Sequence, residues 1–547
     1  LARRGKSTAE LTNGSHSDVI VLGCSLPGIV IAHKLKRKLG NTVDVVVLDL
    51  ATPQRHKTNA KGNVGFLDDV TKESQTEITN ENANSARQIT DYKSKNYMAQ
   101  YACEFKIPLP EAIANPEKVK SPLIKLFQYT NGSTVPCADN YHDFEYLNLL
   151  ERFEINQYQT LLDQHMRDLF QSHTVDFTAE TKILLYFDQT SMEKHIKGAL
   201  LFSTSREIMR TTVSLTCGAP ADQVSVLFYL HQCYRCNGCR HHLGGNNIKI
   251  REKLLGYCRE QLAHKMYQSI ADITLPTNSI KEIRTYSDEQ VILETMKGEK
   301  NYICNLLAMA LKPDQLNDIQ VEDQLLPENI TDILRAMAPG LVKKFIATYE
   351  NNFWSDAGFS GDILSIRGPI VWATERPKFS ATGSEEKYSS LTGFILTRES
   401  SENDSKLLVL EQLVSLFGEQ AASPVIYTES IIKDIYVPRC GDYLGLKRCT
   451  GGKTSKFLVW SALDIFADGD IAAALEAGHS AYLHLMSGLR PQAQTYDDLS
   501  AGEWPTFLSG DPFTRWCSTV NYFTGVRWTL FTLTFLIGIK VLRTLRQ

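Results

Sequence analysis

A strand that runs into a glycine turn, VIVLGCSLPG at residues 19–28, is the feature that most constrains the fold. The pattern predicts a strand at 18–23, a helix at 27–39 with one apolar face, and a second strand at Val43–Leu48. Two strands joined through a helix form a βαβ unit and pair in parallel. The sequence therefore predicts an α/β protein with a doubly wound sheet, and a turn of the kind that receives a dinucleotide pyrophosphate.

The turn departs from the Gly-x-Gly-x-x-Gly pattern at its middle position. Gly23 and Gly28 supply the first and third glycines, whereas Ser25 stands where backbone normally approaches the pyrophosphate. Pro27 removes one amide donor from the helix N-terminus, where anions are held. Asp49 follows the second strand, at the place of the acidic residue that takes the ribose hydroxyls. The changes weaken the predicted cofactor site without abolishing it.

Size and composition set broad limits on the class of protein. A chain of 547 residues exceeds what one hydrophobic core usually serves, so we expect two joined domains. A net charge of -4 with 22% charged residues gives no basic surface for nucleic acid. The 12 cysteines are spread along the chain, which favours reduced thiols in the cytosol over a disulfide scaffold.

The segment Trp528–Leu542, WTLFTLTFLIGIKVL, is apolar except for its threonines and one lysine, and two arginines follow it. We interpret it as a tail anchor, although its uninterrupted part is shorter than the ~20 residues of a standard span. The alternative is an amphipathic or core helix. The positive-inside rule does not settle the orientation of so short a tail.

The remaining pattern alternates between helical and strand regions. Residues 1–17 are predicted to be a loose arm, and the polar residues 51–95 to be loops with one short helix. The region 291–311 is predicted to be a hairpin that leads into a core strand. The other elements expected are helices at Leu147–Phe153, Tyr158–Phe170, Ser205–Thr216, 329–336, 405–417 and 470–486, and strands at 341–349, 361–373 and 391–397.

Several separated stretches resemble the flavin monoamine oxidase family, in the order that the family uses. They are the βαβ unit, the helix TTVSLTCGAPADQVSVLFYLHQC, the run LLPENITDILRAMAPGLVKKFIATYENNFW, the strand GFIL, CGDYLG, GDIAAALEAG and the apolar tail. The resemblance covers roughly residues 18–545. It implies a doubly wound FAD domain built from both chain ends, a mixed-sheet α+β substrate domain inserted between them, and a membrane-anchor helix.

The domain organisation that follows from this resemblance has eight parts. We expect a flexible arm at 1–17, the FAD domain at 18–95, 221–300 and 431–490, a helical substrate-domain segment at 96–220, the substrate domain at 301–430, a linker at 491–527 and the anchor at 528–547. In animal members the anchor holds the enzyme on the mitochondrial outer membrane, facing the cytosol. The resemblance therefore implies that location, with the endoplasmic reticulum membrane as the alternative.

At the positions that contact flavin in this family, the chain departs from the expected residues. The Gly-Gly-Arg run is missing from LATPQRHKTNAKGNVG, and LVWSAL at Leu458–Leu463 puts Trp460 on a glycine position. Asp442 occupies the place of the cysteine that tethers flavin, so a covalent bond there is not expected. Gly469 keeps the glycine that begins the last helix. FAD is therefore the implied cofactor, with binding that is lost or weak.

The implied substrate cage is also incomplete. Tyr443 matches one cage tyrosine, but Asp470 stands at the position of the other, so no aromatic sandwich forms. In the family, a lysine near the flavin supports its reoxidation. The natural register places Ile319 at that position, and Lys312 is nearby. Asp470 next to Tyr443 suggests a degenerate pocket that pairs with a small amine.

The cysteines Cys233, Cys236 and Cys239 have spacing that occurs in zinc sites. A structural zinc site normally draws ligands from two separated loops, so the preferred interpretation is a cysteine-rich loop after a helix, with thiol redox sensing as an alternative.

Taken together, the sequence predicts a membrane-anchored, amine-oxidase-like protein that is catalytically inactive and serves as a binding or scaffold protein, with protein partners, a small amine or a second copy as its ligands. The first alternative is an active FAD-dependent amine or polyamine oxidase with noncovalent flavin. The second is a lumenal flavoprotein more distantly related to prenylcysteine oxidases. Preserved fold residues beside altered cofactor contacts favour the inactive protein.

Overall fold

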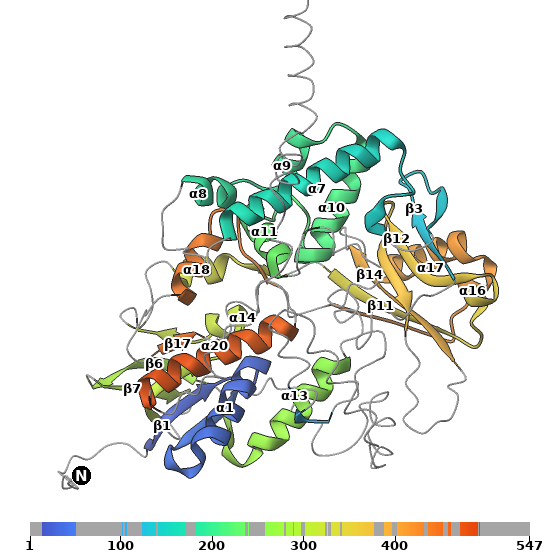
Figure 1. Cartoon of the computed structure of the whole chain (residues 1–547). Helices are drawn as coiled ribbons and strands as arrows, with labels where there is room; N and C mark the ends of the chain where they lie inside the picture. Colours follow the sequence, from blue (N-terminus) through green and yellow to red (C-terminus); the bar gives the residue numbers. More distant parts are fainter. Residues whose placement is uncertain are drawn as a thin grey trace, which may run out of the picture.

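A computed structural model describes the fold. It describes residues 14–50, 123–137, 141–170, 182–235, 257–277, 280–287, 289–296, 301–322, 330–339, 342–376, 388–396, 402–431, 436–451, 458–460 and 471–490, together with positions 101, 104–106, 239, 325 and 492. The described chain builds two sheets and a layer of helices (Figure 1).

The first sheet contains the predicted βαβ unit. Its strand order is β5-β2-β1-β8-β7-β6-β9, and β17 also pairs with β8. Strands β1, β2, β5, β8 and β17 run parallel, whereas β8, β7 and β6 form an antiparallel meander. The bounds are β1 Gly14–Leu22, β2 Val45–Leu50, β5 Thr274–Thr277, β6 Ile280–Ser287, β7 Gln290–Thr295, β8 Asn301–Met309, β9 Gln320–Val321 and β17 Leu458–Trp460.

Helices from opposite ends of the chain cover this sheet. Residues 19–22 of β1 are completely buried, as expected for a central parallel strand covered on both faces. Helix α1 (Leu26–Leu39) contacts both α20 (Ile471–Leu489) and α13 (Tyr257–Ile270). The blue α1 and the red α20 lie together beside the sheet in Figure 1. The observed domain is therefore assembled from distant parts of the sequence.

The second sheet has the order β15-β11-β14-β13-β12-β3-β4 and is mostly antiparallel. Helix α17 (Glu402–Phe417) packs its buried Val409 and Leu413 into a separate core with side chains from the sheet. The strand bounds are β3 Ile124–Gln128, β4 Thr134–Cys137, β11 Val342–Tyr349, β12 Phe359–Ser365, β13 Ile370–Glu375, β14 Ser389–Leu396 and β15 Ile426–Ile431. This second core lies between α17 and the mixed sheet, whereas other side chains of the sheet, such as Trp372 and Phe394, belong to the main core.

A helical layer lies over the region between the two sheets (Figure 1). It consists of α7 Leu149–Phe170, α8 Lys182–Gln189, α9 Met192–Ala199, α10 Ser203–Cys217 and α11 Val226–Arg235, and α18 Tyr443–Gly451 contacts α8. The smaller elements are α14 Pro313–Asn317, α15 Ile330–Ala336, α16 Phe353–Asp356, the pair β10 Ala338–Pro339 and β16 Tyr436–Val437, and 3₁₀ turns at Gly40–Thr42, Tyr141–Asp143, Ala271–Ile273 and Glu419–Ala422.

Three sequence expectations differ from the observed elements. The arm predicted at 1–17 ends earlier, because β1 begins at Gly14, where it pairs with Asn301 of β8. The two helices predicted between residues 147 and 170 are one continuous helix, α7. The boundary predicted at residue 300 separates β7 from β8, which are neighbours in one sheet, so the first domain continues through Met309.

Two predicted segments fall outside the described residues. These are the polar segment 51–95 and the anchor at 528–547. Among the helices that the structure describes, none combines the length and apolar character needed to cross a bilayer.

Candidate cofactor and substrate site

The glycine turn between β1 and α1 has the backbone geometry that its sequence predicts. Gly23 has a φ of 100°, and a Cβ at this position would lie 2.6 Å from the carbonyl oxygen of Ala310. A Cβ on Gly28 would lie 2.3 Å from the carbonyl oxygen of Gly23. Both positions therefore require glycine, the first for conformation and the second for close packing of the helix on the turn.

Ser25 directs its hydroxyl toward the sheet. The Oγ donates a hydrogen bond of 2.7 Å to the carbonyl oxygen of Ala310, just beyond the end of β8. With its proton held there, this hydroxyl is not a donor toward a phosphate at the helix N-terminus. The serine thus reinforces the contact between the turn and β8 and leaves phosphate binding to backbone amides.

The N-terminus of α1 retains two amides for an anion. Ile29 donates the first helical hydrogen bond, to the carbonyl of Ser25, at 3.0 Å. The amides of Leu26 and Gly28 precede this bond and have no acceptor within the helix, whereas Pro27 has no N–H. Asp49 lies half-buried near the end of β2, and its carboxylate makes no hydrogen bond to any residue that the structure describes. This end of the site fits the pyrophosphate and ribose of FAD.

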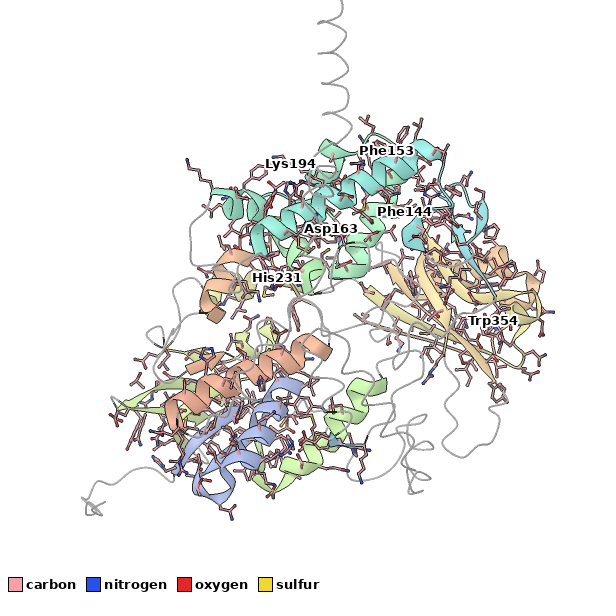
Figure 2. All side chains as sticks on the ribbon, in the orientation of Figure 1. Phe144, Phe153, Asp163, Lys194, His231 and Trp354 are labelled. Atoms are coloured by element: carbon pink, nitrogen blue, oxygen red, sulfur yellow. The ribbon has the colours of Figure 1, made fainter. Side chains whose placement is uncertain are left out.

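The other end of the predicted site lies at the start of α18. Asp442 comes immediately before the helix, and Tyr443 is its first residue. Tyr443 is 1% exposed, its hydroxyl lies 2.6 Å from Nδ1 of His231, and its ring packs 5.0 Å from that of Phe228. Figure 2 shows His231 on the lower side of the helical layer. The side chain of Tyr443 is therefore engaged in packing, and it is not presented as a free aromatic wall.

A buried carboxylate that the sequence analysis missed holds this turn. Asp188 at the end of α8 is 1% exposed and accepts a hydrogen bond of 3.0 Å from the amide of Leu444 and one of 3.3 Å from the Ser225 hydroxyl. Burial raises the pKa of Asp188 from 3.8 to about 6. Burial also raises the pKa of Asp442. These contacts make Asp188 a cap for the first turn of α18, supplied from another helix.

The expected lysine position is apolar. Ile319 is buried in the main core, and its amide donates to the carbonyl of Leu316. Lys312 lies between β8 and α14, where its backbone amide donates to the Gln315 side chain at 3.1 Å. Lys312 is thus two residues from Ala310, at the dinucleotide turn.

The thiols Cys233 and Cys239 come together in the interior. Both are fully buried. Burial is the main cause that raises the pKa of Cys239 well above its usual range, and the hydrogen bond with Cys233 is the second. The amide of Cys239 donates to the Asp163 carboxylate at 3.0 Å. Cys236 lies outside the described residues, within which no group of three or more His, Cys, Asp or Glu side chains is placed to hold a metal ion. The raised pKa disfavours the thiolate that redox sensing requires.

Three further predicted positions are not placed. Gly469 and Asp470 lie just before α20 and outside the described residues. Trp460 ends β17, where its backbone pairs with Met309, but its side chain is not described. The pairing of Asp470 with an amine and the filling of a pocket by Trp460 therefore stay predictions.

Comparison with known proteins identifies relatives over parts of the chain. No protein-family model matches it. The chain is 25% identical over 263 residues to a probable flavin-containing monoamine oxidase A of Dictyostelium discoideum, which covers 46% of this chain and 54% of that protein. It is 28% identical over 130 residues to putrescine oxidase of Kocuria rosea, covering 23% and 26% of the two chains. The chain thus spans about half the length of the first relative and a quarter of the second.

Solved structures share the fold over a larger part of the chain. A putrescine oxidase variant aligns with a TM-score of 0.64 and 16% identity, covering 86% of this chain and 99% of that one. Cyclohexylamine oxidase of Brevibacterium oxydans aligns with a TM-score of 0.63 and 15% identity, covering 86% and 99%. FAD is the cofactor that these similarities imply. In its fold, and over part of its sequence, the chain is similar to flavin-containing amine oxidases, which confirms the resemblance predicted from its motifs.

Proposed function

We propose that this chain is a membrane-associated, amine-oxidase-like protein that does not oxidise amines and that acts by binding or scaffolding. The observation that carries the proposal is the burial of the Tyr443 side chain. Its ring is buried against Phe228, and its hydroxyl lies 2.6 Å from His231, so it serves the packing of α18 on α11. An amine cage needs two aromatic faces turned toward a ligand.

Two neighbouring positions support the same proposal. Asp442 precedes Tyr443 where a tethering cysteine would stand, and a carboxylate cannot form a thioether to flavin. Ile319 is buried at the position expected for the reoxidation lysine. Relative to the family pattern, Asp442 and Ile319 replace the thiol that tethers flavin and the lysine that supports its reoxidation, and the helices around them stay packed. We infer that flavin binding is impaired and that catalysis is absent.

The dinucleotide turn is the observation that favours the alternative, an active oxidase with noncovalent FAD. The Leu26 and Gly28 amides and the Asp49 carboxylate suit the pyrophosphate and ribose. These groups would contact the end of the cofactor that does no chemistry. They are therefore compatible with either function, and a direct measurement has to separate the two.

The deciding experiment is an absorbance spectrum of the full chain purified in mild detergent, before and after acid precipitation. We expect no band near ~450 nm, where enzyme-bound flavins absorb, and no change on adding FAD. The Ser25→Gly variant is the matched test of the turn, because it restores the missing glycine. A stoichiometric flavin in the unmodified chain, with hydrogen peroxide released on adding putrescine or a monoamine, would overturn the proposal.

Membrane association is proposed to come from the apolar segment 528–542. The position suggested by the resemblance is the mitochondrial outer membrane, facing the cytosol, and the endoplasmic reticulum membrane is the alternative. Fractionation followed by carbonate extraction and protease protection separates these cases. Release of the chain by carbonate would contradict anchoring.

A further inference from the structure

An uncommon concentration of exposed apolar side chains marks one end of the helical layer. At the start of α7, Leu149 is 83% exposed, Leu150 67% and Phe153 52%. In the connection between α9 and α10, Leu201 is 50% exposed and Phe202 37%. Single exposed leucines are normal on protein surfaces, whereas neighbouring large apolar side chains indicate an interaction site.

Glu154 joins these two groups of residues. Its carboxylate is buried and accepts hydrogen bonds from the backbone amides of Leu201, at 2.6 Å, and of Phe202, at 3.2 Å. Leu150 lies one helical turn before Glu154, and Phe153 directly precedes Glu154. Leu150 and Phe153 therefore occupy the surface of α7 that adjoins Glu154. We call the five residues Leu149, Leu150, Phe153, Leu201 and Phe202 the apolar edge.

The connection that carries Leu201 and Phe202 is a defined structure. Besides the two bonds to Glu154, the carbonyl of Leu200 accepts a hydrogen bond of 2.9 Å from Nε of Arg206. Each oxygen of this buried carboxylate accepts one of the two amides, which offsets part of the cost of burying it. The fold therefore holds these apolar side chains outward in a fixed arrangement.

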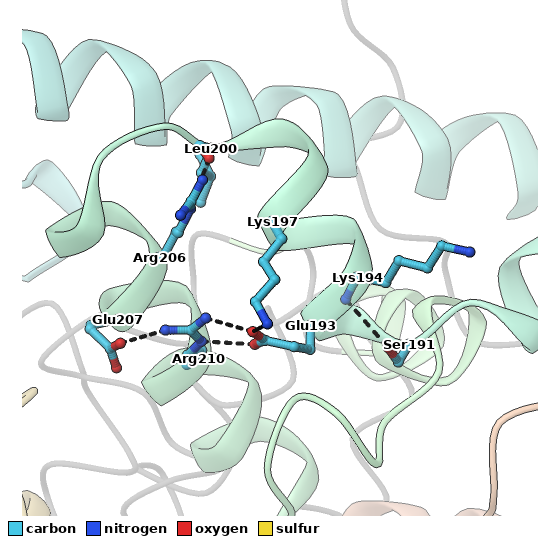
Figure 3. Close-up of polar contacts among 8 residues, drawn as sticks. All are labelled: Ser191, Glu193, Lys194, Lys197, Leu200, Arg206, Glu207 and Arg210. Carbon is cyan, nitrogen blue, oxygen red and sulfur yellow. Dashed lines mark hydrogen bonds and ion pairs between the residues drawn. The ribbon is translucent and has the colours of Figure 1, made fainter.

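The exposed cation of Lys194 stands next to a set of ion pairs on α9 and α10, near the apolar edge. Glu193 on α9 pairs with Arg210, whose Nε lies 2.8 Å away, and with Lys197 at 2.9 Å, and Arg210 also pairs with Glu207, so these four charges balance. The hydrogen bond from Arg210 is the main cause that lowers the pKa of Glu193 to about 2. Lys194 is exposed, and its side chain extends away from this network in Figure 3. Figure 2 shows Lys194 and Phe153 along the upper margin of the same layer.

We propose that the apolar edge inserts into the interfacial layer of an anionic lipid bilayer, with Lys194 at the headgroups. The proposal rests on the proposed membrane association through residues 528–542. Four of the five side chains are half or more exposed, so they project from the surface, as insertion into lipid requires. Stable membrane binding usually takes two weak signals, and an apolar segment of only 15 residues leaves a role for a second. Insertion would fix which face of the body meets the membrane.

Photocrosslinking on the full chain tests this placement. Phe153 is replaced by p-benzoylphenylalanine in chain bound to vesicles of phosphatidylcholine and phosphatidylserine, and adducts are identified by mass spectrometry. The matched control carries the same probe at Leu407, which is 61% exposed on α17 of the second sheet. We expect phospholipid adducts at position 153 and none at 407. Adducts at 153 that contain only protein, or equal lipid labelling at both positions, would overturn the proposal.

Vesicle binding separates this proposal from membrane anchoring. Leu150→Asp should weaken binding to the same vesicles by about tenfold or more, from the loss of one buried leucine, whereas Leu407→Asp should leave it unchanged. Leu536→Arg places a charge in the apolar segment and tests the anchor alone. Loss of binding in Leu536→Arg with no effect of Leu150→Asp would retain the anchor and refute the apolar edge. A chain that binds no vesicles at all refutes both.

Discussion

The buried carboxylate of Asp188 gives the helical layer a pH-dependent stability that one substitution removes. Asp188 is 1% exposed, and its pKa is raised from 3.8 to about 6 by burial, against the opposing effect of the Leu444 amide. The folded state therefore binds a proton more tightly than the unfolded state. Between about pH 4 and pH 6 the folded chain keeps this proton while the unfolded chain has lost it, so stability falls as pH rises through that window.

The size of the effect follows from the difference in pKa. Because the pKa of Asp188 rises by about two on folding, ionised Asp188 lowers the free energy of unfolding by about 3 kcal/mol relative to its value in strongly acidic solution. About 2 kcal/mol of this appears between about pH 4.5 and about pH 7.5. Asp188→Asn keeps an oxygen for the Leu444 amide and carries no charge. As pH rises from about 4.5 to about 7.5, the free energy of unfolding of Asp188→Asn should therefore rise by about 2 kcal/mol relative to that of the unmodified chain.

The assay is the apparent Tm of both chains, measured at one scan rate at each pH. For a chain of this size we expect the Tm difference between Asp188→Asn and the unmodified protein to widen by about 2–4 °C from the acidic to the neutral condition. Asp442→Asn is the matched control in the same turn, and its partly exposed carboxylate should give a smaller change. A Tm difference that stays constant with pH would refute the reasoning, because the charge would then not be the cause.

Three further experiments test contacts in other parts of the fold. Gly478→Ala should destabilise by about 1–3 kcal/mol, because its Cβ would lie 2.9 Å from Pro27 backbone, whereas Gly488→Ala in the same helix meets no contact below 3.6 Å and should stabilise by up to about 1 kcal/mol in thermal unfolding. Tyr443→Phe should cost about 1 kcal/mol in denaturant unfolding, through the lost bond to His231, and unchanged stability would argue against that bond. Lys125→Met should cost about 3–5 kcal/mol, because it removes the cation that lies 3.5 Å from the buried carboxylate of Asp362; the double variant with Asp362→Asn should recover most of the loss.

Local signals in the sequence were sufficient for the βαβ unit of the first sheet. The apolar strand and glycine spacing predicted β1, α1 and the turn at Gly23, because the required conformation is encoded within a few residues. The start of β1 was misplaced because residues 14–17 are polar. They are a strand only through pairing with residues 301–304 of β8, which no local pattern reports.

Contacts in the candidate site depended on partners far apart in sequence. Asp188 and Leu444 are separated by 256 positions, and Tyr443 and His231 by 212. A family motif points to Tyr443, but nothing near it indicates that its hydroxyl is taken by a histidine of α11. His231 lies within the quoted helix LFYLHQC, so that motif was the available signal, although it carries no information about the partner.

The glycines of the turn and the residues of α18 are not equal evidence about cofactor use. A Cβ on Gly23 would strike the Ala310 carbonyl, one on Gly28 the Gly23 carbonyl, and one on Gly478 the backbone of Pro27. These clashes are internal to the fold, so the same glycines are needed whether or not a dinucleotide binds. Their presence therefore argues for the architecture alone. Tyr443 differs because no comparable backbone constraint demands a tyrosine there, so its burial against Phe228 is the observation that supports the proposed loss of the amine cage.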